Sequence, residues 1–363
     1  MTMDPQQPVS VVVVDDSPLV RSVLRSVLTS AVGCEVVGEA GDGQEAVRLA
    51  ISLRPQVITM DLAMPRLNGL EAITRIMSEA PTRILVVSDP SASVEAARAF
   101  DAVARGALDV MTKPSAWVRR EKERLIATVR RLASVPVVFH PRGAFESRRP
   151  QPLALPAHPK SPGVIVIGAS TGGPRALHRL LAGRGADFPI PMVIVQHLGE
   201  DFATGFIDWL GTATTLSVRE ATAARSLTAG QVLVGVRGGH VTLSAAGRIY
   251  ISDAPARDGH RPAIDTLFES AADVFGGSAV GVLLTGMGSD GAHGLARIRA
   301  AGGVTVAQDE ASCTVFGMPK VAIELGAAGA VLNLEQIRHF LDVLAGSARP
   351  PARAAGTAAG GGG

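Results

Sequence analysis

A glycine-rich stretch around one serine is the first feature of this sequence that could carry out a reaction. Residues 163–174 read GVIVIGASTGGP, an apolar run that breaks into glycines around Ser170. The letters fit the G-x-S-x-G pattern of a strand-to-helix turn that exposes a nucleophilic serine. They do not fit a dinucleotide-binding loop, which needs G-x-G-x-x-G, or a P-loop, which needs G-K-[ST]. Ser170 is therefore a candidate nucleophile.

A serine nucleophile needs a base and an acid, and the sequence offers both at the ends of other apolar runs. His197 ends the run VIVQH, and Asp290 lies in the glycine-rich turn LLTGMGSDG. The histidine would accept the serine proton, and the carboxylate would fix the histidine tautomer. The same turn could present the backbone N–H of Met287 to an oxyanion. Asp290 could instead cap a helix. Three other histidines compete for the role of base: His240, His260 and His293.

A second group of polar residues follows the apolar runs of the N-terminal third. Asp15 and Asp16 follow the first run, and Asp61 follows the third. Ser88 and Lys113 end the fourth and the fifth. The carboxyl ends of parallel strands meet at one edge of a sheet, so these side chains should converge. Three carboxylates together favour Mg²⁺, and a phosphoryl group on one of them would find a metal, an ammonium and a hydroxyl for its oxygens.

Alternating strands and helices must position both groups. In the first predicted domain, residues 1–134, five β-branched runs alternate with helical stretches, which is typical of a doubly wound parallel sheet. Residues 135–162 hold seven prolines and predict a linker. The pattern resumes in a second α/β domain, residues 163–345, with a hairpin-like insertion around 231–252. Its helices are expected near 174–182, 201–210, 262–275, 290–301 and 319–326. Residues 346–363 have low complexity and are expected to be disordered.

Composition narrows the class of protein. The 363 residues exceed the roughly 250–300 at which a single core stops growing, so two domains are expected. The formal net charge is only +2, and the basic stretch RREKERLIATVRR mixes both signs and predicts a solvated helix face, so a nucleic-acid partner is not favoured. Cys34 and Cys313 are far apart, which fits a reducing compartment. No run reaches the roughly 18–20 apolar residues of a membrane span and no signal peptide is evident, so we expect a cytoplasmic protein without membrane insertion.

The N-terminal motifs VDDS, MDLAMPRLNG and TKP resemble those of the receiver domain of bacterial response regulators. The resemblance implies a flavodoxin-like fold that is phosphorylated on an aspartate. It implies these roles: phosphoacceptor Asp61, Mg²⁺ ligands Asp15, Asp16 and Asp61, phosphoryl contact Lys113 and switch hydroxyl Ser88. Many receivers have an aromatic residue where this sequence has Val110, which puts a switch by an aromatic ring at that position in doubt.

Five stretches of the second domain carry another resemblance: IGASTGGP, VQHL, HRPAIDTLFESAA, LLTGMGSDGAHGL and VTVAQDEASCTVFGMPKVAIELGA. They resemble the catalytic domain of the chemotaxis protein-glutamate methylesterases of the CheB type. The resemblance implies a Rossmann-like domain with Ser170 as nucleophile and His197 as base. It also implies Asp290 as the orienting acid and the Met287 amide as an oxyanion donor. Arg237 stands where the family usually has a proline.

Together the two resemblances imply a hydrolase that phosphorylation activates. It would demethylate glutamate methyl esters and deamidate glutamines on methyl-accepting chemotaxis receptors, with a chemotaxis histidine kinase as phosphodonor. Mg²⁺ would serve phosphorylation, and ester hydrolysis would need no cofactor. The unphosphorylated receiver would cover the triad. A rival is a phosphorylation-gated binding protein without turnover. A DNA-binding response regulator has less support because the second domain lacks a basic recognition helix.

Overall fold

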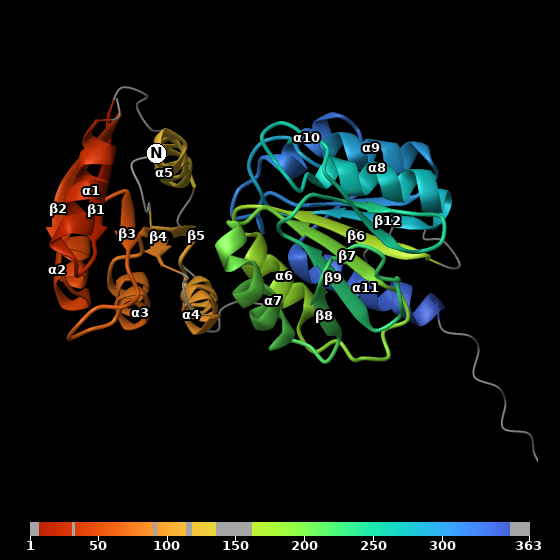
Figure 1. Cartoon of the computed structure of the whole chain (residues 1–363), viewed down its shortest axis with the longest axis horizontal. Coiled ribbons are helices and arrows are strands. Elements are labelled where there is room, and N and C mark those ends of the chain that lie inside the picture. Colours follow the sequence, from red (N-terminus) through yellow and green to blue (C-terminus); the bar gives the residue numbers. More distant parts are fainter. Residues whose placement is uncertain (1–6, 31–32, 90–92, 114–117, 136–161, 349–363) are drawn as a thin grey trace, which may run out of the picture.

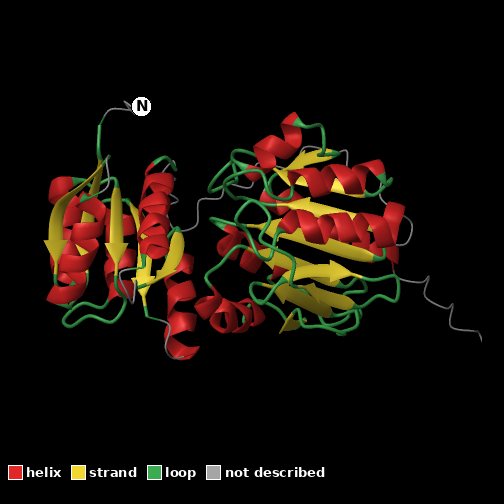
Figure 2. Ribbon diagram, turned by 45° about the horizontal axis from the view of Figure 1, so that its top comes forward, coloured by secondary structure: helices red, strands yellow, loops and turns green. Residues whose placement is uncertain are grey.

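The chain forms two α/β domains that lie side by side, as Figures 1 and 2 show. The structure is a computed structural model that describes residues 7–30, 33–89, 93–113, 118–135 and 162–348. The two large sheets are parallel, and helices cover both faces of each, which confirms the predicted fold class. Nearly all of the predicted linker and tail lie outside the described residues. Among the helices that the structure describes, none has the length and apolar character needed to span a membrane.

The N-terminal sheet has five parallel strands in the order β2-β1-β3-β4-β5. Its strands are β1 (Val9–Val14), β2 (Cys34–Ala40), β3 (Val57–Met60), β4 (Arg83–Ser88) and β5 (Asp109–Thr112). Its helices are α1 (Pro18–Thr29), α2 (Gly43–Leu53), α3 (Gly69–Glu79), α4 (Ser93–Ala104) and α5 (Arg119–Ala133). The strand order reverses at β1, and ligands of such sheets bind at the carboxyl ends of the strands at that point.

The C-terminal sheet has seven parallel strands in the order β14-β13-β12-β6-β7-β9-β8. Its strands are β6 (Val164–Ala169), β7 (Met192–Gln196), β8 (Ser217–Glu220), β9 (Gln231–Gly235), β12 (Ala279–Leu283), β13 (Val304–Gln308) and β14 (Ala330–Leu332), and β10 (His240–Leu243) pairs with β11 (Ile249–Ser252) in a separate hairpin. Its helices are α6 (Gly173–Leu181), α7 (Ala203–Gly211), α8 (Ile264–Phe275), α9 (Ala292–Ala300), α10 (Met318–Glu324) and α11 (Leu334–Ala348), with 3₁₀ turns η1 (Glu200–Phe202) and η2 (Gly276–Ser278). The order reverses at β6, so the carboxyl ends of β6, β7 and β12 meet there.

The C-terminal domain differs from the prediction in several elements. The predicted hairpin insertion was too long, because β9 pairs in parallel with β7 and β8, and the antiparallel strand pair is β10 with β11. β9 is almost wholly buried, as an inner strand of a covered sheet should be. β8, β14 and α11 were not predicted, and the two strands are short edge strands with exposed residues. The predicted domain end at residue 345 falls inside α11.

Aromatic side chains join the two domains. Phe100 on α4 is fully buried, and its ring centroid lies 6.3 Å from that of Phe202, 5.2 Å from Phe206 and 5.6 Å from Trp209. α4 packs along α7 at this contact, and both figures place these helices at the domain boundary. The apolar core is therefore continuous across the boundary.

Helix α5 is not the solvated face that its mixed charges predicted. Leu125, Val129 and Leu132 are fully buried in the N-terminal core, and Val315 of the other domain packs against the same cluster. The helix is strongly amphipathic, so the charged residues that dominate its sequence occupy one side of an otherwise packed element. In Figure 1 it lies over β4 and β5, at the end of the sheet that is nearer the C-terminal domain.

Candidate functional site

Ser170 and His197 directly follow adjacent strands. Ala169 at the end of β6 is in register with Gln196 at the end of β7, and the His197 N–H donates to the Ala169 carbonyl at 3.0 Å. The Ser170 N–H donates to the Thr285 carbonyl at 3.0 Å, which ties it to the strand on its other side. The buried Gln196 donates through Nε2 to the carbonyl oxygens of Ser170 and His197, both at 2.9 Å. The backbones of the predicted nucleophile and base are thereby linked.

Asp290 is brought to His197 from the turn after β12. The His197 Nε2 lies 2.9 Å from Asp290 Oδ2, and the carboxylate also accepts the N–H groups of Ile264 at 2.8 Å and Asp265 at 2.9 Å. The alternative role of Asp290 as a cap is therefore also real, but the helix that it caps is α8 rather than its own. Burial alone would raise the pKa of Asp290, but these hydrogen bonds and the His197 charge hold it below its ordinary value.

The protonation of the His197 ring follows from this contact. An ionised carboxylate can only accept, so Nε2 of His197 must donate to Asp290. The other nitrogen, Nδ1, is buried and has no hydrogen-bond partner within the described residues. Its lone pair is the one available to accept a proton. Ser170 Oγ likewise has no partner among those residues, as is common before substrate binds.

The structure separates His197 from the three histidines that competed with it. The ring of His240 is used on both sides, since Nε2 donates to the Pro255 carbonyl at 3.0 Å and Nδ1 accepts the Ala263 N–H at 3.1 Å. His293 is exposed on α9. His260 lies against the face of the His197 ring. Of these four described histidines, only His197 hydrogen-bonds Asp290.

The segment that contains Met287 passes directly beside Ser170. A Cβ on Gly286 would lie 2.7 Å from the Ser170 Cβ and 2.4 Å from Met318 Sδ, so only glycine fits there. Gly286 is fixed by its N–H to the Val315 carbonyl at 3.0 Å. The Met287 N–H finds no acceptor in the part of the chain that the structure describes, and 49% of the Met287 residue surface is exposed. An N–H beside the serine is thus free to bind an oxyanion.

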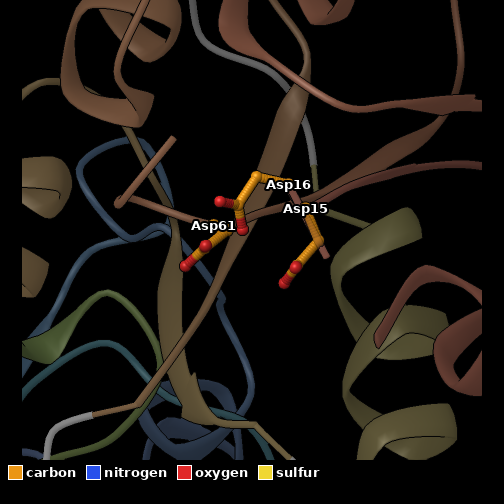
Figure 3. A group of neighbouring side chains, drawn as sticks. All are labelled: Asp15, Asp16 and Asp61. Atoms are coloured by element: carbon orange, nitrogen blue, oxygen red, sulfur yellow. The ribbon is translucent and has the colours of Figure 1, made fainter. Parts of the chain in front are cut away.

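The predicted phosphorylation residues converge at the other sheet. Figure 3 shows the carboxylates of Asp15, Asp16 and Asp61 close together, and one oxygen of each lies within 4.8 Å of the others. Lys113 Nζ lies 2.8 Å from Asp15 Oδ2 and 3.0 Å from Asp61 Oδ2. Ser88 is buried and lines the same small cavity as Asp61 and Lys113. Three carboxylate oxygens, a lysine and a hydroxyl therefore surround one space.

Comparison with known proteins identifies both domains. Residues 165–341 match the family model described as CheB methylesterase, and residues 11–129 match that of the response regulator receiver domain. A protein-glutamate methylesterase/protein-glutamine glutaminase of Anaeromyxobacter dehalogenans is 46% identical over 337 residues, which cover 92% of this chain and 96% of the relative. The chain belongs to the CheB methylesterase family. A relative of the same name from Myxococcus xanthus is 42% identical, and one from Paramagnetospirillum magneticum is 41% identical. Both alignments span 93% of this chain, and they span 94% and 97% of the respective relatives.

In this CheB-type chain the receiver domain contacts the residue next to Ser170. Asp109, at the start of β5, accepts from Thr171 Oγ1 at 3.4 Å and from Arg131 of α5 at 3.3 Å. Burial raises the pKa of Asp109, although Arg131 acts in the opposite direction. Ser170 retains only 9% of its surface exposure. The receiver therefore reaches the residue next to the nucleophile, and no sequence motif signals this contact because it joins side chains of two domains.

The same strand of the receiver ends at the phosphorylation residues. Thr112 Oγ1 donates to Asp201 Oδ2 of the CheB domain at 2.9 Å, and the next residue, Lys113, contacts Asp61. β5 therefore touches the CheB domain near both of its ends while its carboxyl end reaches Asp61. If Lys113 moved towards a new phosphoryl group, it would pull on β5, the strand whose Asp109 contacts Thr171 beside Ser170.

Two departures from the family patterns have local explanations. Many receivers have an aromatic residue at the position of Val110. Here the smaller Val110 side chain is buried in the apolar core that also contains Phe100. Arg237 holds Glu220 of β8 through two hydrogen bonds of 2.8 and 2.9 Å, and these lower the pKa of Glu220.

Proposed function

We propose that the chain hydrolyses glutamate methyl esters on methyl-accepting chemotaxis receptors and converts receptor glutamines to glutamates. The observation that carries the proposal is the 2.9 Å contact between His197 and Asp290 beside Ser170, an arrangement that activates a serine hydroxyl. The names of the relatives, protein-glutamate methylesterase/protein-glutamine glutaminase, support this substrate class. A cytoplasmic location and a chemotaxis histidine kinase as phosphodonor belong to the same proposal.

The proposed reaction proceeds in two halves. Ser170 Oγ attacks the ester carbonyl carbon while His197 Nδ1 takes its proton, and the Met287 N–H binds the carbonyl oxygen as it becomes negative. The C–O bond to the methoxy group then breaks, and methanol leaves with the proton from His197. A water molecule gives its proton to His197 and cleaves the acyl-enzyme, which releases the glutamate carboxyl and restores Ser170. With a glutamine side chain, ammonia takes the place of methanol.

The receiver residues fit phosphorylation of Asp61 with Mg²⁺. Asp15, Asp16 and Asp61 would hold the ion through carboxylate oxygens, the donors that Mg²⁺ prefers. The ion would supply positive charge at the phosphoryl oxygens. Burial raises the pKa of Asp61, although Lys113 opposes this, and the positive charge of the ion would favour the ionised carboxylate that attacks. Lys113 and Ser88 would then bind phosphoryl oxygens.

Phosphorylation would act by releasing the receiver from the CheB domain. A tethered domain has an effective concentration of about millimolar, so a weak contact suffices to keep the site covered. Reversing a tenfold bias between covered and open forms takes about 2.7 kcal/mol, which new charge and hydrogen bonds at Asp61 can supply. The contact between α4 and α7 and the bond from Thr171 to Asp109 would both have to separate.

The direct test is methanol release from radiolabelled, methylated receptor membranes, with and without a small-molecule phosphodonor plus Mg²⁺. Release that rises with the phosphodonor is the expected result. If phosphorylation of Asp61 is demonstrated and no methanol appears from any receptor in a panel, the chain is a phosphorylation-gated binding protein instead.

Loss of the phosphoacceptor should separate basal from stimulated activity. In Asp61→Asn the carboxylate that receives the phosphoryl group is gone, so phosphodonor plus Mg²⁺ should no longer raise methanol release. Chelation of Mg²⁺ by EDTA should have the same effect on the parent chain. Stimulation that survives in Asp61→Asn would place the phosphoryl group elsewhere.

A larger side chain at the contact between α4 and α7 should separate the two domains and activate the enzyme without phosphorylation. A Cβ on Gly205 of α7 would lie 2.5 Å from the Ala96 Cβ and 2.7 Å from its carbonyl carbon on α4, so Gly205→Leu should keep the domains apart. We expect basal release to rise about tenfold or more, with little further effect of phosphodonor. Gly211→Leu is the matched control, because no atom lies within 4 Å of a Cβ there. Equal basal rates in the two variants would contradict occlusion.

A further inference from the structure

A second histidine lies face to face with the base of the proposed triad. The ring centroids of His260 and His197 are 3.8 Å apart, and the ring planes differ by only 2°. Aromatic pairs more often have centroids roughly 4.5–7 Å apart in offset or edge-on arrangements, so this is a close approach. The His260 ring has no hydrogen bond to any described residue. The ring contact that is observed for His260 is its stack on His197.

The backbone around His260 holds the ring in this place. His260 and Arg257 exchange two backbone hydrogen bonds, of 2.9 and 3.1 Å, which close a tight turn. Arg257 is anchored to Glu269 of α8 at 2.7 Å. On the other side, the Ala263 N–H is bound to the buried His240. These bonds fix the backbone on both sides of His260, which carries the half-buried ring.

The stack restrains a rotation of the His197 ring that the hydrogen bond to Asp290 alone does not prevent. Asp290 holds the His197 ring at Nε2 alone, so the ring can swing about that hydrogen bond and carry Nδ1 away from Ser170. A flat ring 3.8 Å from one face of His197 opposes this swing. We propose that His260 is a positioning residue for the hydrolysis, whose ring keeps Nδ1 of His197 in the orientation that accepts the Ser170 proton. This inference rests on the function proposed above.

The environment of the stack allows His260 to position the His197 ring without itself accepting the Ser170 proton. The groups that face it are His197 after β7, Asp290 before α9, Asp258 in its own turn and Arg131 on α5 of the receiver. Burial and the positive charge of His197 lower the pKa of His260 to about 4. His260 is thus neutral above about pH 5, and the stack carries a single positive charge when His197 is protonated.

The test compares three variants of the full chain, assayed for methanol release with phosphodonor and Mg²⁺. His260→Phe keeps a flat ring without nitrogens, His260→Leu fills the space without a flat face, and His260→Ala leaves it empty. We expect the phenylalanine variant to keep kcat within about threefold, and the other two to lose about 10–100-fold in kcat with KM unchanged. The pH–rate profile of His260→Phe above about pH 5 should match that of the parent, because His260 does not titrate there.

Three results would overturn the inference. Parent-like kcat in His260→Ala would show that the stack is dispensable. Equal losses in the phenylalanine and alanine variants would mean that a ring nitrogen of His260 is needed. A leucine variant as active as the phenylalanine variant would reduce the role to filling space.

A substrate-free measurement keeps the inference separate from the proposed function. In intact chains with ¹⁵N-labelled histidine, the parent and His260→Phe should show His197 as one tautomer protonated at Nε2. His260→Ala should keep this tautomer, set by Asp290, but show broadened His197 signals, because the His197 ring is no longer held in one orientation. Identical His197 spectra in all three would overturn the positioning role. If the parent releases no methanol, the proposed function fails while this comparison still decides the inference.

Discussion

Ser170→Ala is expected to lower methanol release by at least about 10³-fold, because it removes the oxygen that forms the acyl-enzyme. The variant should fold normally. Ser170 is held through its backbone, by its N–H to Thr285 and by its carbonyl, which accepts from Gly173 and Gln196, while its Oγ bonds no described residue. The measurement is the turnover of phosphorylated enzyme on methylated receptor membranes. The residual rate would come from the oxyanion donor and substrate binding alone.

The control for this variant is Ser289→Ala, an exposed serine in the turn that leads to Asp290. It should keep parent-like turnover. Both variants should unfold within about 0.5 kcal/mol of the parent, since neither removes a buried side-chain contact. A loss of less than tenfold in Ser170→Ala would remove Ser170 from the role of nucleophile and favour the binding-protein alternative.

Asp290→Asn is expected to cost about 10³–10⁴-fold in kcat, nearly as much as loss of the nucleophile. The carboxylate accepts from three donors, the His197 ring and the N–H groups of Ile264 and Asp265. An amide has only one oxygen, so its NH₂ group must face at least one of these donors. If it faces His197, the ring changes tautomer and Nδ1 carries a proton in place of the lone pair.

The pH dependence of this variant gives a second readout. The pKa of Asp290 is lowered in the folded chain, so the ionised carboxylate stabilises the fold above its unfolded pKa of about 4, and this stabilisation is lost as the pH falls through the folded value. Asp290→Asn should therefore show a weaker loss of stability as the pH falls below about 4 in thermal unfolding. Asp273→Asn, which changes an exposed carboxylate paired with Arg297, should match the parent in both assays. A kcat above a tenth of the parent in Asp290→Asn would contradict its role.

The sequence by itself determined the architecture and the candidate residues of the two sites. Buried parallel strands such as β1 and β6 are continuously apolar because both faces are covered, so they can be recognised from local composition. Polar residues placed immediately after such strands must meet at one edge of the sheet. For this reason Ser170, His197 and Asp61 could be named as candidates from their positions along the chain, while their roles were predicted from the family resemblances.

Only the tertiary structure decided which polar groups meet across the strand ends. It chose His197 over His240 because the ring of His240 is occupied by Pro255 and Ala263. It also showed Gln196 tying Ser170 to His197, for which the sequence offers only a polar residue at the end of an apolar strand. These bonds depend on the register and twist of neighbouring strands, which local patterns do not encode.

The contact between the domains was likewise decided only by packing. The mixed charges of α5 predicted a solvated helix, yet its apolar side packs in the receiver core and its Arg131 holds Asp109 beside Thr171. A helix sequence reports which side is apolar but not what covers its polar side. The contact beside Ser170 joins side chains of two domains, Thr171 and Asp109, and the same two domains pack through Phe100 where α4 meets α7.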